Sequence, residues 1–455
     1  MTKALSKIYL PEDRSFYKRY AGLALTIALQ NVIVFGVNLA DNVMMGGYSE
    51  ISLSAVALVN QIQFFLQMLI MGTGDGIVVL ASRYWGKCDI KSIKKVAGVG
   101  MFIGLSAATL LFCAVFIAPE SVLGLLTDKK DVIVEATKYM KIICFTYFFF
   151  GMTNILLAVL RSVETAKIGF FVSLSALIIN ISLNYILIYG KFGAPELGIV
   201  GAAIATLVAR IVEFAVVVIY LAKVDKKLFL KLHDFFKLEK EYITQFLKVS
   251  APVVLSNTSW GIAMAMQTGI LGRLEASVLP ANSISTAVFQ ILSVVMYGSA
   301  SATSVLIGKS IGERKTKETI TRYAKFLQII FIALGLCTAT GLFLFKDIII
   351  NFYEIAPETR ALALQFMTVL SITSIGTSYQ MPCLTGIVRG GGDTKFVLFN
   401  DLIFMWCIVL PASALSAFVF RLPSLVVFMC LKSDQILKCF VAIFKVNRFK
   451  WMKNI

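Results

Sequence analysis

The most regular feature of the sequence is a succession of long apolar runs separated by short polar connections. A hydrocarbon core about 30 Å thick needs roughly 20 helical residues, so each run is long enough to predict one membrane-spanning helix. The last run is interrupted by Lys432, Asp434 and Gln435, although Asp434 and Lys438 are i, i+4 neighbours that can pair. The pattern predicts an all-α polytopic membrane protein with apolar runs at 20–47, 52–81, 96–118, 133–160, 166–189, 197–222, 249–271, 279–307, 324–345, 359–388, 396–420 and 422–444.

The second half of the chain repeats the first. A shift of 228 residues superposes RSVETAK at 161–167 on RGGGDTK at 389–395. Six helices in each half is an even number, so both halves start on the same side of the bilayer, as in transporters with parallel repeats. We expect an N-lobe over 1–222, a linker over 223–248 and a C-lobe over 249–455. A shift of 226 also aligns four identical pairs: Asn31 with Asn257, Gly46 with Gly272, Gly72 with Gly298, and Gly86 with Gly312.

Composition and charge support a membrane location and predict an orientation. The 455 residues are 58% hydrophobic and 15% charged, whereas soluble domains have about 25% charged residues. With the N-terminus placed inside, the inner connections hold 32 of the 43 Lys and Arg residues and the outer ones hold 9, which predicts two cytoplasmic termini. The net charge of +17 then reflects topology, and we expect no nucleic-acid partner. The first run is longer than the core of a cleaved signal, so we expect it to be retained.

Several function classes are disfavoured. The eight cysteines follow no disulfide or metal-ligand spacing, and no catalytic constellation or ATPase motif is present, so we expect neither an enzyme nor a cofactor. The glycines of GTGDG at 72–76 follow no strand. The only histidine, His233, lies in the linker, which is basic and amphipathic, as expected of a helix on an anionic inner leaflet. Because the sequence has no ATPase motif, any uphill transport must be driven by an ion gradient.

An acid inside the first run is the leading functional candidate. An ionisable residue within a span is expensive and suggests a function. Asp41 shares a helix side with Asn31 and Asn38, and Asn180 and Asn184 lie at a matching depth in the run 166–189. A carboxylate removed from bulk water can take up a proton, and hard oxygens can instead ligate Na⁺ transiently. We expect Asp41, Asn180 and Asn184 to form an ion-coupling site; the alternative is a carboxylate that only ties helices together.

Other polar residues inside the runs predict a substrate cavity and an inner gate. Asp75, Arg210 and Glu213 lie in inner halves of their runs and could close the inner side, the alternative being a static ion pair. The apolar runs of the second half carry no central acid, and Asp401 is expected at the membrane–water interface. We therefore expect the ion-coupling site in the first half. The expected cavity residues are Asn31, Asn38, Gln63, Gln67, Asn154, Thr206, Asn257 and Gln267.

The chain resembles the multidrug and toxic compound extrusion (MATE) family of cation-coupled antiporters. The matching segments are ALQNVIVFGVNLADNVMMGG, NISLNYILIYGKFGAPELGIVGAAIAT, ASRYWGK, IGKSIGERK, RGGGDTK and the closing LKSDQILK and RFKWMKN. The resemblance implies twelve helices in two six-helix lobes. The family's first-helix acid falls on Asp41 and its fifth-helix amide on Asn180, whereas Asn184 stands where one branch carries a second acid.

We therefore expect an antiporter that exports amphipathic, often cationic organic compounds in exchange for H⁺ or Na⁺ by alternating access. It would act as a monomer in the plasma membrane of a prokaryote, with small-molecule substrates and the bilayer as partners. The alternative is a flippase for a lipid-linked precursor. That reading expects several cations in the cavity to hold phosphate, and only Arg210 lies deep within a regular run.

Overall fold

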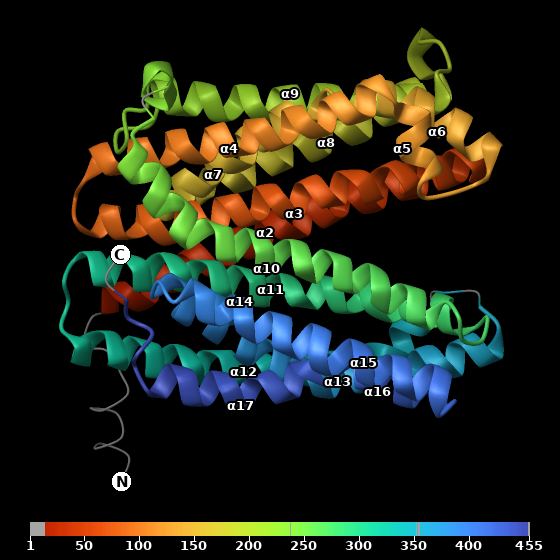
Figure 1. Ribbon diagram of the computed structural model, residues 1–455. Coiled ribbons are helices and arrows are strands. Elements are labelled where there is room, and N and C mark those ends of the chain that lie inside the picture. Colours follow the sequence, from red (N-terminus) through yellow and green to blue (C-terminus); the bar gives the residue numbers. More distant parts are fainter. Residues whose placement is uncertain (1–13, 237, 352, 354, 454–455) are drawn as a thin grey trace. The chain divides into compact units, whose positions relative to one another are not determined.

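The computed structural model describes residues 14–236, 238–351, 353 and 355–453, and every element in these residues is helical (Figure 1). By internal packing the chain divides into two compact units, here called the N-unit (Leu29–Val254) and the C-unit (Met1–Ala28 with Leu255–Ile455). Two long helices, α2 (Arg14–Tyr48) and α10 (Lys240–Leu271), contribute residues to both units.

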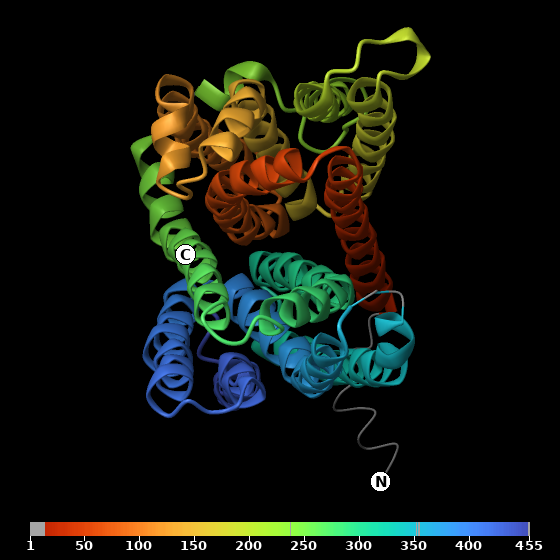
Figure 2. The same cartoon turned by 90° about the vertical axis from the view of Figure 1, so that its right-hand side faces the viewer.

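The N-unit is built around α3. Helix α3 contacts α4, α6 and α7, and Figure 2 shows these helices viewed roughly along their axes. The buried residues of α3 join an apolar core that continues into α4, α7 and α9. The elements of this unit, besides parts of α2 and α10, are α3 (Glu50–Gly86), α4 (Ile90–Ile117), α5 (Pro119–Gly124), α6 (Lys130–Ile143), α7 (Thr146–Ser162), α8 (Lys167–Tyr189), η1 (Lys191–Gly193), α9 (Gly198–Lys223) and η2 (Leu232–Phe236).

The C-unit packs α11 and α12 against α13, and α13 against α17. Three of its segments, η3, η4 and η5, are π-helical, a geometry that inserts an extra residue into a turn and often marks functional sites. Its elements are α11 (Val278–Gly312), α12 (Lys317–Ile350), α13 (Pro357–Met381), η3 (Pro382–Val388), α14 (Thr394–Leu402), η4 (Ile403–Val409), α15 (Leu410–Ala414), η5 (Leu415–Val419), α16 (Ser424–Lys432) and α17 (Asp434–Asn447).

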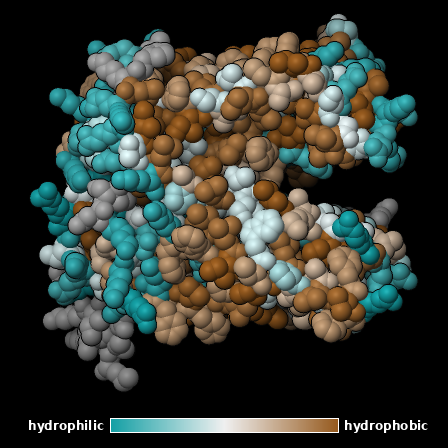
Figure 3. Space-filling view, viewed as in Figure 1, coloured by the Kyte–Doolittle hydropathy of each residue, from teal (hydrophilic) through white to brown (hydrophobic). Residues whose placement is uncertain are grey.

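The helices have the length and surface of membrane spans. In the described part of the chain, nine are long and apolar enough to cross a bilayer, and the pair α6 and α7, bent by 51°, makes a tenth. Helix α10 and the pair α16 and α17 occupy the remaining two predicted runs. Hydrophobic side chains cover the middle of the helices and hydrophilic ones gather at their ends (Figure 3). The predicted all-α polytopic fold is confirmed.

Close helix contacts within each unit occur at equivalent positions of the 226-residue sequence repeat. A Cβ added to Gly72 of α3 would lie 2.6 Å from the Cα of Val254 in α10. A Cβ added to Gly298 of α11 would lie 2.6 Å from the carbonyl oxygen of Ala24 in α2 and 3.1 Å from the side chain of Ala28. Gly72 and Gly298 are 226 residues apart, as are Ala28 and Val254. Each half therefore presses its second helix against the first helix of the other half.

This exchange explains why the packing units differ from the expected lobes. The units change over at Ala28–Leu29 and at Val254–Leu255, which are repeat-equivalent positions within α2 and α10. The lobes predicted at 1–222 and 249–455 concern the sequence repeat, and their role as the moving parts of a transport cycle stays a prediction.

The linker does not form one amphipathic helix. Helix α9 ends at Lys223, one short 3₁₀ turn follows at Leu232–Phe236, and α10 begins at Lys240. The turn is held on the N-unit because Lys94 of α4 pairs with Asp234 at 2.9 Å and donates to the Phe229 carbonyl at 2.7 Å. Contacts of Lys94 therefore tie this turn to α4, and the expected contact of the linker with lipid stays a prediction.

Candidate ion-coupling site

The three residues expected to bind the coupling ion lie together in the N-unit. Asn184 donates from Nδ2 to Asp41 Oδ1 at 2.5 Å and to Asn180 Oδ1 at 3.2 Å. Asn180 in turn donates to Thr206 Oγ1 of α9 at 3.4 Å. A chain of hydrogen bonds therefore joins α2, α8 and α9 around one carboxylate.

Local geometry sets this alignment. Asn180 and Asn184 are i, i+4 neighbours and face the same way on α8. Helix α8 ends at Tyr189, and the next residue, Gly190, caps it in the left-handed conformation with a φ of +62°. The chain then returns as α9, where a Cβ on Gly201 would lie 2.6 Å from the Leu187 carbonyl oxygen. This close approach of α8 and α9 brings Thr206 within reach of Asn180.

The surroundings of Asp41 are buried but contain a second charge pair. Arg210 interacts electrostatically with Asp41, but its ion pair is with Glu213, at 2.7 Å. The Arg210 guanidinium also lies 5.2 Å from the ring centre of Phe150. Glu213 neutralises the charge of Arg210. The group formed by Asp41, Arg210 and Glu213 therefore has a net charge of −1 when all three are ionised, and the unpaired charge is that of Asp41.

One hydrogen-bonding group in this site is unsatisfied. Asn184 is 0% exposed, and its carbonyl oxygen Oδ1 has no hydrogen-bond partner. An unpaired buried acceptor costs about 1–3 kcal/mol. A proton on Asp41, with the amide turned to accept it, or a monovalent cation would satisfy this oxygen. The described residues hold no group of three or more His, Cys, Asp or Glu side chains that could bind a metal ion.

The expected inner gate is divided between two pairs. Arg210 and Glu213 are joined as described, whereas Asp75 of α3 interacts electrostatically with Arg161 of α7. Residue spacing along single helices identified the first pair but not Arg161, because the partner of Asp75 comes from another helix.

The expected cavity residues fall in both units. Asn257 and Gln267 belong to the C-unit, where the Gln267 amide contacts Met405 Sδ at 3.4 Å. Asn154 donates to the Phe150 carbonyl of its own helix at 2.8 Å, so its amide is engaged locally. The other expected cavity residues belong to the N-unit and are Asn31, Asn38, Gln63, Gln67 and Thr206.

Two further interactions go beyond what the sequence predicts. Tyr139 of α6 hydrogen-bonds to Thr206 and lies within electrostatic range of Asp41; a tyrosine in an ordinary apolar run gives no signal. In the C-unit, Lys438 pairs with Asp401 at 3.0 Å and with Asp434 at 3.4 Å, and Ser256 donates to Asp401 at 2.6 Å. The pairing of Asp434 with Lys438 that their i, i+4 spacing predicts is confirmed, whereas the sequence gives no sign that Asp401 joins them.

Comparison with known proteins agrees with this architecture. The chain is 25% identical to the uncharacterized transporter YisQ of Bacillus subtilis over 413 residues, which cover 89% of this chain and 88% of that protein. It is 22% identical to the probable multidrug resistance protein NorM of Thermotoga maritima, with 100% of this chain and 97% of that protein covered.

Solved structures show the same fold. A crystal structure of MATE in complex with MaL6 superposes with a TM-score of 0.87 at 19% identity, and covers 99% of this chain and 100% of that one. A MOP superfamily transporter from Pyrococcus furiosus gives a TM-score of 0.86 at 19% identity. The MatE family model matches residues 26–186 and 252–420. The chain therefore belongs to the MATE family of multidrug efflux transporters.

Proposed function

We propose that this protein is an antiporter that exports amphipathic, often cationic organic compounds in exchange for H⁺ or Na⁺, with Asp41 as the ion-binding carboxylate. The observation that carries the proposal is the contact between Asp41 and Asn184, in which a buried acid meets an amide whose carbonyl oxygen lacks a partner. Such a site is complete only when a proton or a cation is bound.

Charge supports the exchange of ion for substrate at this site. With no ion bound, Asp41 is the one uncompensated charge of its group and attracts an organic cation. Binding of H⁺ or Na⁺ neutralises it and releases that cation. The two ligands therefore compete, which is the condition for antiport in an alternating-access cycle. Asn180 accepts a hydrogen bond from Asn184 and so favours the donating orientation of this amide while Asp41 is ionised.

The setting of this activity is part of the same proposal. The excess of Lys and Arg in the expected inner connections supports cytoplasmic termini in a prokaryotic plasma membrane. We propose a monomer as the working unit, and the polar residues predicted for the cavity as its substrate contacts. The flippase alternative is weakened because Arg210 is already paired with Glu213 and is not available to hold a lipid phosphate.

The test is export of a fluorescent organic cation from proteoliposomes under a pH gradient or a Na⁺ gradient, each imposed alone. Wild-type protein should show saturable flux under one gradient, and Asp41→Asn should lose it while inserting normally. Glu50→Gln is the matched control, because Glu50 is the exposed acid at the start of α3. Full activity of Asp41→Asn would disprove the role of Asp41. Absence of flux under both gradients would favour the flippase.

A further inference from the structure

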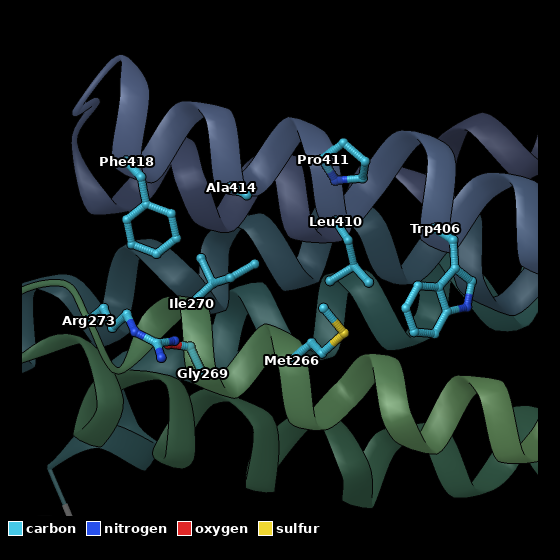
Figure 4. Close-up of a pocket in the computed structure, with 9 residues that line it drawn as sticks. All are labelled: Met266, Gly269, Ile270, Arg273, Trp406, Leu410, Pro411, Ala414 and Phe418. Carbon is cyan, nitrogen blue, oxygen red and sulfur yellow. The ribbon is translucent and has the colours of Figure 1, made fainter.

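A hollow of about 460 Å³ lies within the C-unit between α10 and the segment formed by η4, α15 and η5. Figure 4 shows side chains of the two elements facing each other across it, with Met266 and Ile270 on α10 opposite Leu410 on α15. The Trp406 ring lies at one end of this groove, and Phe418 and Arg273 lie at the other.

The groove exists because small residues lie on both of its sides. Gly269 of α10 would place a Cβ in open space, with the flexible Arg273 side chain at 3.6 Å as its nearest neighbour. Ala414 lines the other side. Pro411 cannot donate a backbone hydrogen bond, and the flanking η4 and η5 turns are π-helical. These irregular turns allow the segment to bulge and leave the space unfilled.

The chemistry of the groove is asymmetric. Its depth is lined by aliphatic, aromatic and thioether groups, and the indole N–H of Trp406 is already used, because it donates to Ser259 Oγ at 2.6 Å. Arg273 supplies the only charge in the lining. A guanidinium has five N–H donors, and one of its nitrogens bonds to the Gly269 carbonyl at 3.1 Å. The groove therefore suits a long apolar group that ends in an anion, and it repels organic cations.

Its length and depth match one leaflet of a bilayer. Arg273 lies two residues beyond the end of α10 at Leu271, in the connection to α11, and so at a membrane surface. Trp406 and Phe418 are separated by twelve helical residues, which span at most about 18 Å, the length of an α-helix at 1.5 Å per residue. Half of a hydrocarbon core is about 15 Å.

We propose that this groove binds an anionic phospholipid, with one acyl chain between α10 and α15 and the phosphate on Arg273. By the predicted orientation the lipid comes from the outer leaflet. The site uses none of the residues around Asp41, so its existence and the antiport proposal stand or fall separately.

Trp406 provides a direct probe, because bromine atoms on an acyl chain quench a tryptophan that they touch. Purified protein in detergent is titrated with dibrominated phosphatidylglycerol or dibrominated phosphatidylcholine. The Trp406→Phe variant gives the background from Trp85, Trp260 and Trp451. We expect saturable quenching of the Trp406 signal at a lower concentration of phosphatidylglycerol than of phosphatidylcholine.

Two variants separate a specific site from general contact with lipid. Arg273→Gln should weaken the apparent affinity for phosphatidylglycerol about tenfold, the value of one charge-assisted hydrogen bond. Gly269→Leu should abolish saturable quenching, because its side chain fills the groove. Lys191→Gln, which removes a surface cation on the same expected side, and Gly341→Leu, at a glycine with open space around it, serve as controls. Quenching that does not saturate, or that is unchanged in Arg273→Gln and Gly269→Leu, would overturn the proposal.

Discussion

The amide nitrogen of Asn184 lies 2.5 Å from a carboxylate oxygen of Asp41. This hydrogen bond links α8 to α2 through two residues that are 143 positions apart in the sequence. The partner of the buried acid is thus an amide rather than a cation. A lysine or arginine in this place would hold the carboxylate permanently ionised. An amide can donate to an ionised carboxylate and, after turning over, accept from a protonated one. This pairing leaves both charge states of Asp41 accessible.

We expect Asn184→Ala to lower the rate of gradient-driven export by roughly tenfold or more, because it removes a hydrogen bond to a charged group worth about 1.5–3 kcal/mol. The measurement is flux in proteoliposomes at equal protein content. Ser175→Ala on the same helix, which removes only a bond to the Val172 carbonyl, should transport normally. Equal rates for Asn184→Ala and wild type would show that the amide has no part in coupling.

Glu213→Gln is expected to damage both stability and transport. Glu213 is 6% exposed and is the ion-pair partner of Arg210, and breaking a buried pair costs about 3–5 kcal/mol. The freed guanidinium would then also compete for Asp41. Thermal unfolding in detergent and flux in proteoliposomes measure the two effects.

The double variant Arg210→Met with Glu213→Gln tests the cause. Since it removes both charges, it should recover most of the lost stability. Glu313→Gln is a suitable control, because Glu313 pairs with Lys309 and Lys315 near the surface at 3.7 and 3.3 Å; its loss should change stability by about 1 kcal/mol or less. A double variant no more stable than Glu213→Gln would show that the destabilisation does not come from the unpaired Arg210.

Gly72→Ala should destabilise the protein by about 1–3 kcal/mol, as overpacking does elsewhere. Its Cβ would lie 2.6 Å from the backbone of Val254, which cannot rotate away as a side chain can. Gly341→Ala in α12, where a Cβ would meet nothing within 4 Å, should instead stabilise by about 0.5–1 kcal/mol. Unfolding midpoints in detergent give both values, and equal shifts would contradict the close contact of α3 with α10.

Docking of the linker should depend on Asp234. Burial alone would raise the pKa of this residue, but the Lys231 N–H, which donates at 3.0 Å, and the nearby Lys94 ammonium hold the pKa below the ordinary value of an aspartic acid. The carboxylate therefore stabilises the docked linker at pH values above that ordinary pKa, and this contribution is lost as the pH falls through the lower, folded pKa.

We expect Asp234→Asn to undock the turn at neutral pH and to speed tryptic cleavage after Lys226, Lys227 or Lys231 several-fold. Glu241→Gln, at an exposed position in the first turn of α10, should leave the cleavage rate unchanged. If Asp234→Asn is cleaved no faster than wild type, the ion pair with Lys94 does not hold the segment.

The spans and the Asp41 cluster could be predicted because each depends on regular spacing. Apolar runs of bilayer length have no alternative in soluble packing, and Asn180 and Asn184 lie four residues apart in one of them. Asp41 lies at a similar depth in its own span, and this similarity predicts that it is close to the two amides. The structure agrees in bringing the three together.

Contacts between helices distant in sequence could not be predicted in the same way. Asp75 interacts electrostatically with Arg161 on another helix, and the buried Lys438 pairs with Asp401 of α14 in addition to Asp434. The amphipathic composition of the linker predicts a helix, but it does not reveal the ion pair of Asp234 with Lys94, which lies in a short turn. The hydrophobic pattern of the sequence predicts which residues are buried. It does not predict with which of several basic side chains an acidic residue forms an ion pair.

The reciprocal packing of Gly72 on Val254 and of Gly298 on Ala28 has a consequence for how the chain folds. Each half of the sequence contributes the beginning of its first helix to the packing unit of the other half, as the protomers of a domain-swapped dimer do. We therefore expect that neither half forms a complete folding unit on its own. A fragment cut at the linker would expose the closely packed surface around Gly72 or Gly298, which the other half covers in the intact chain.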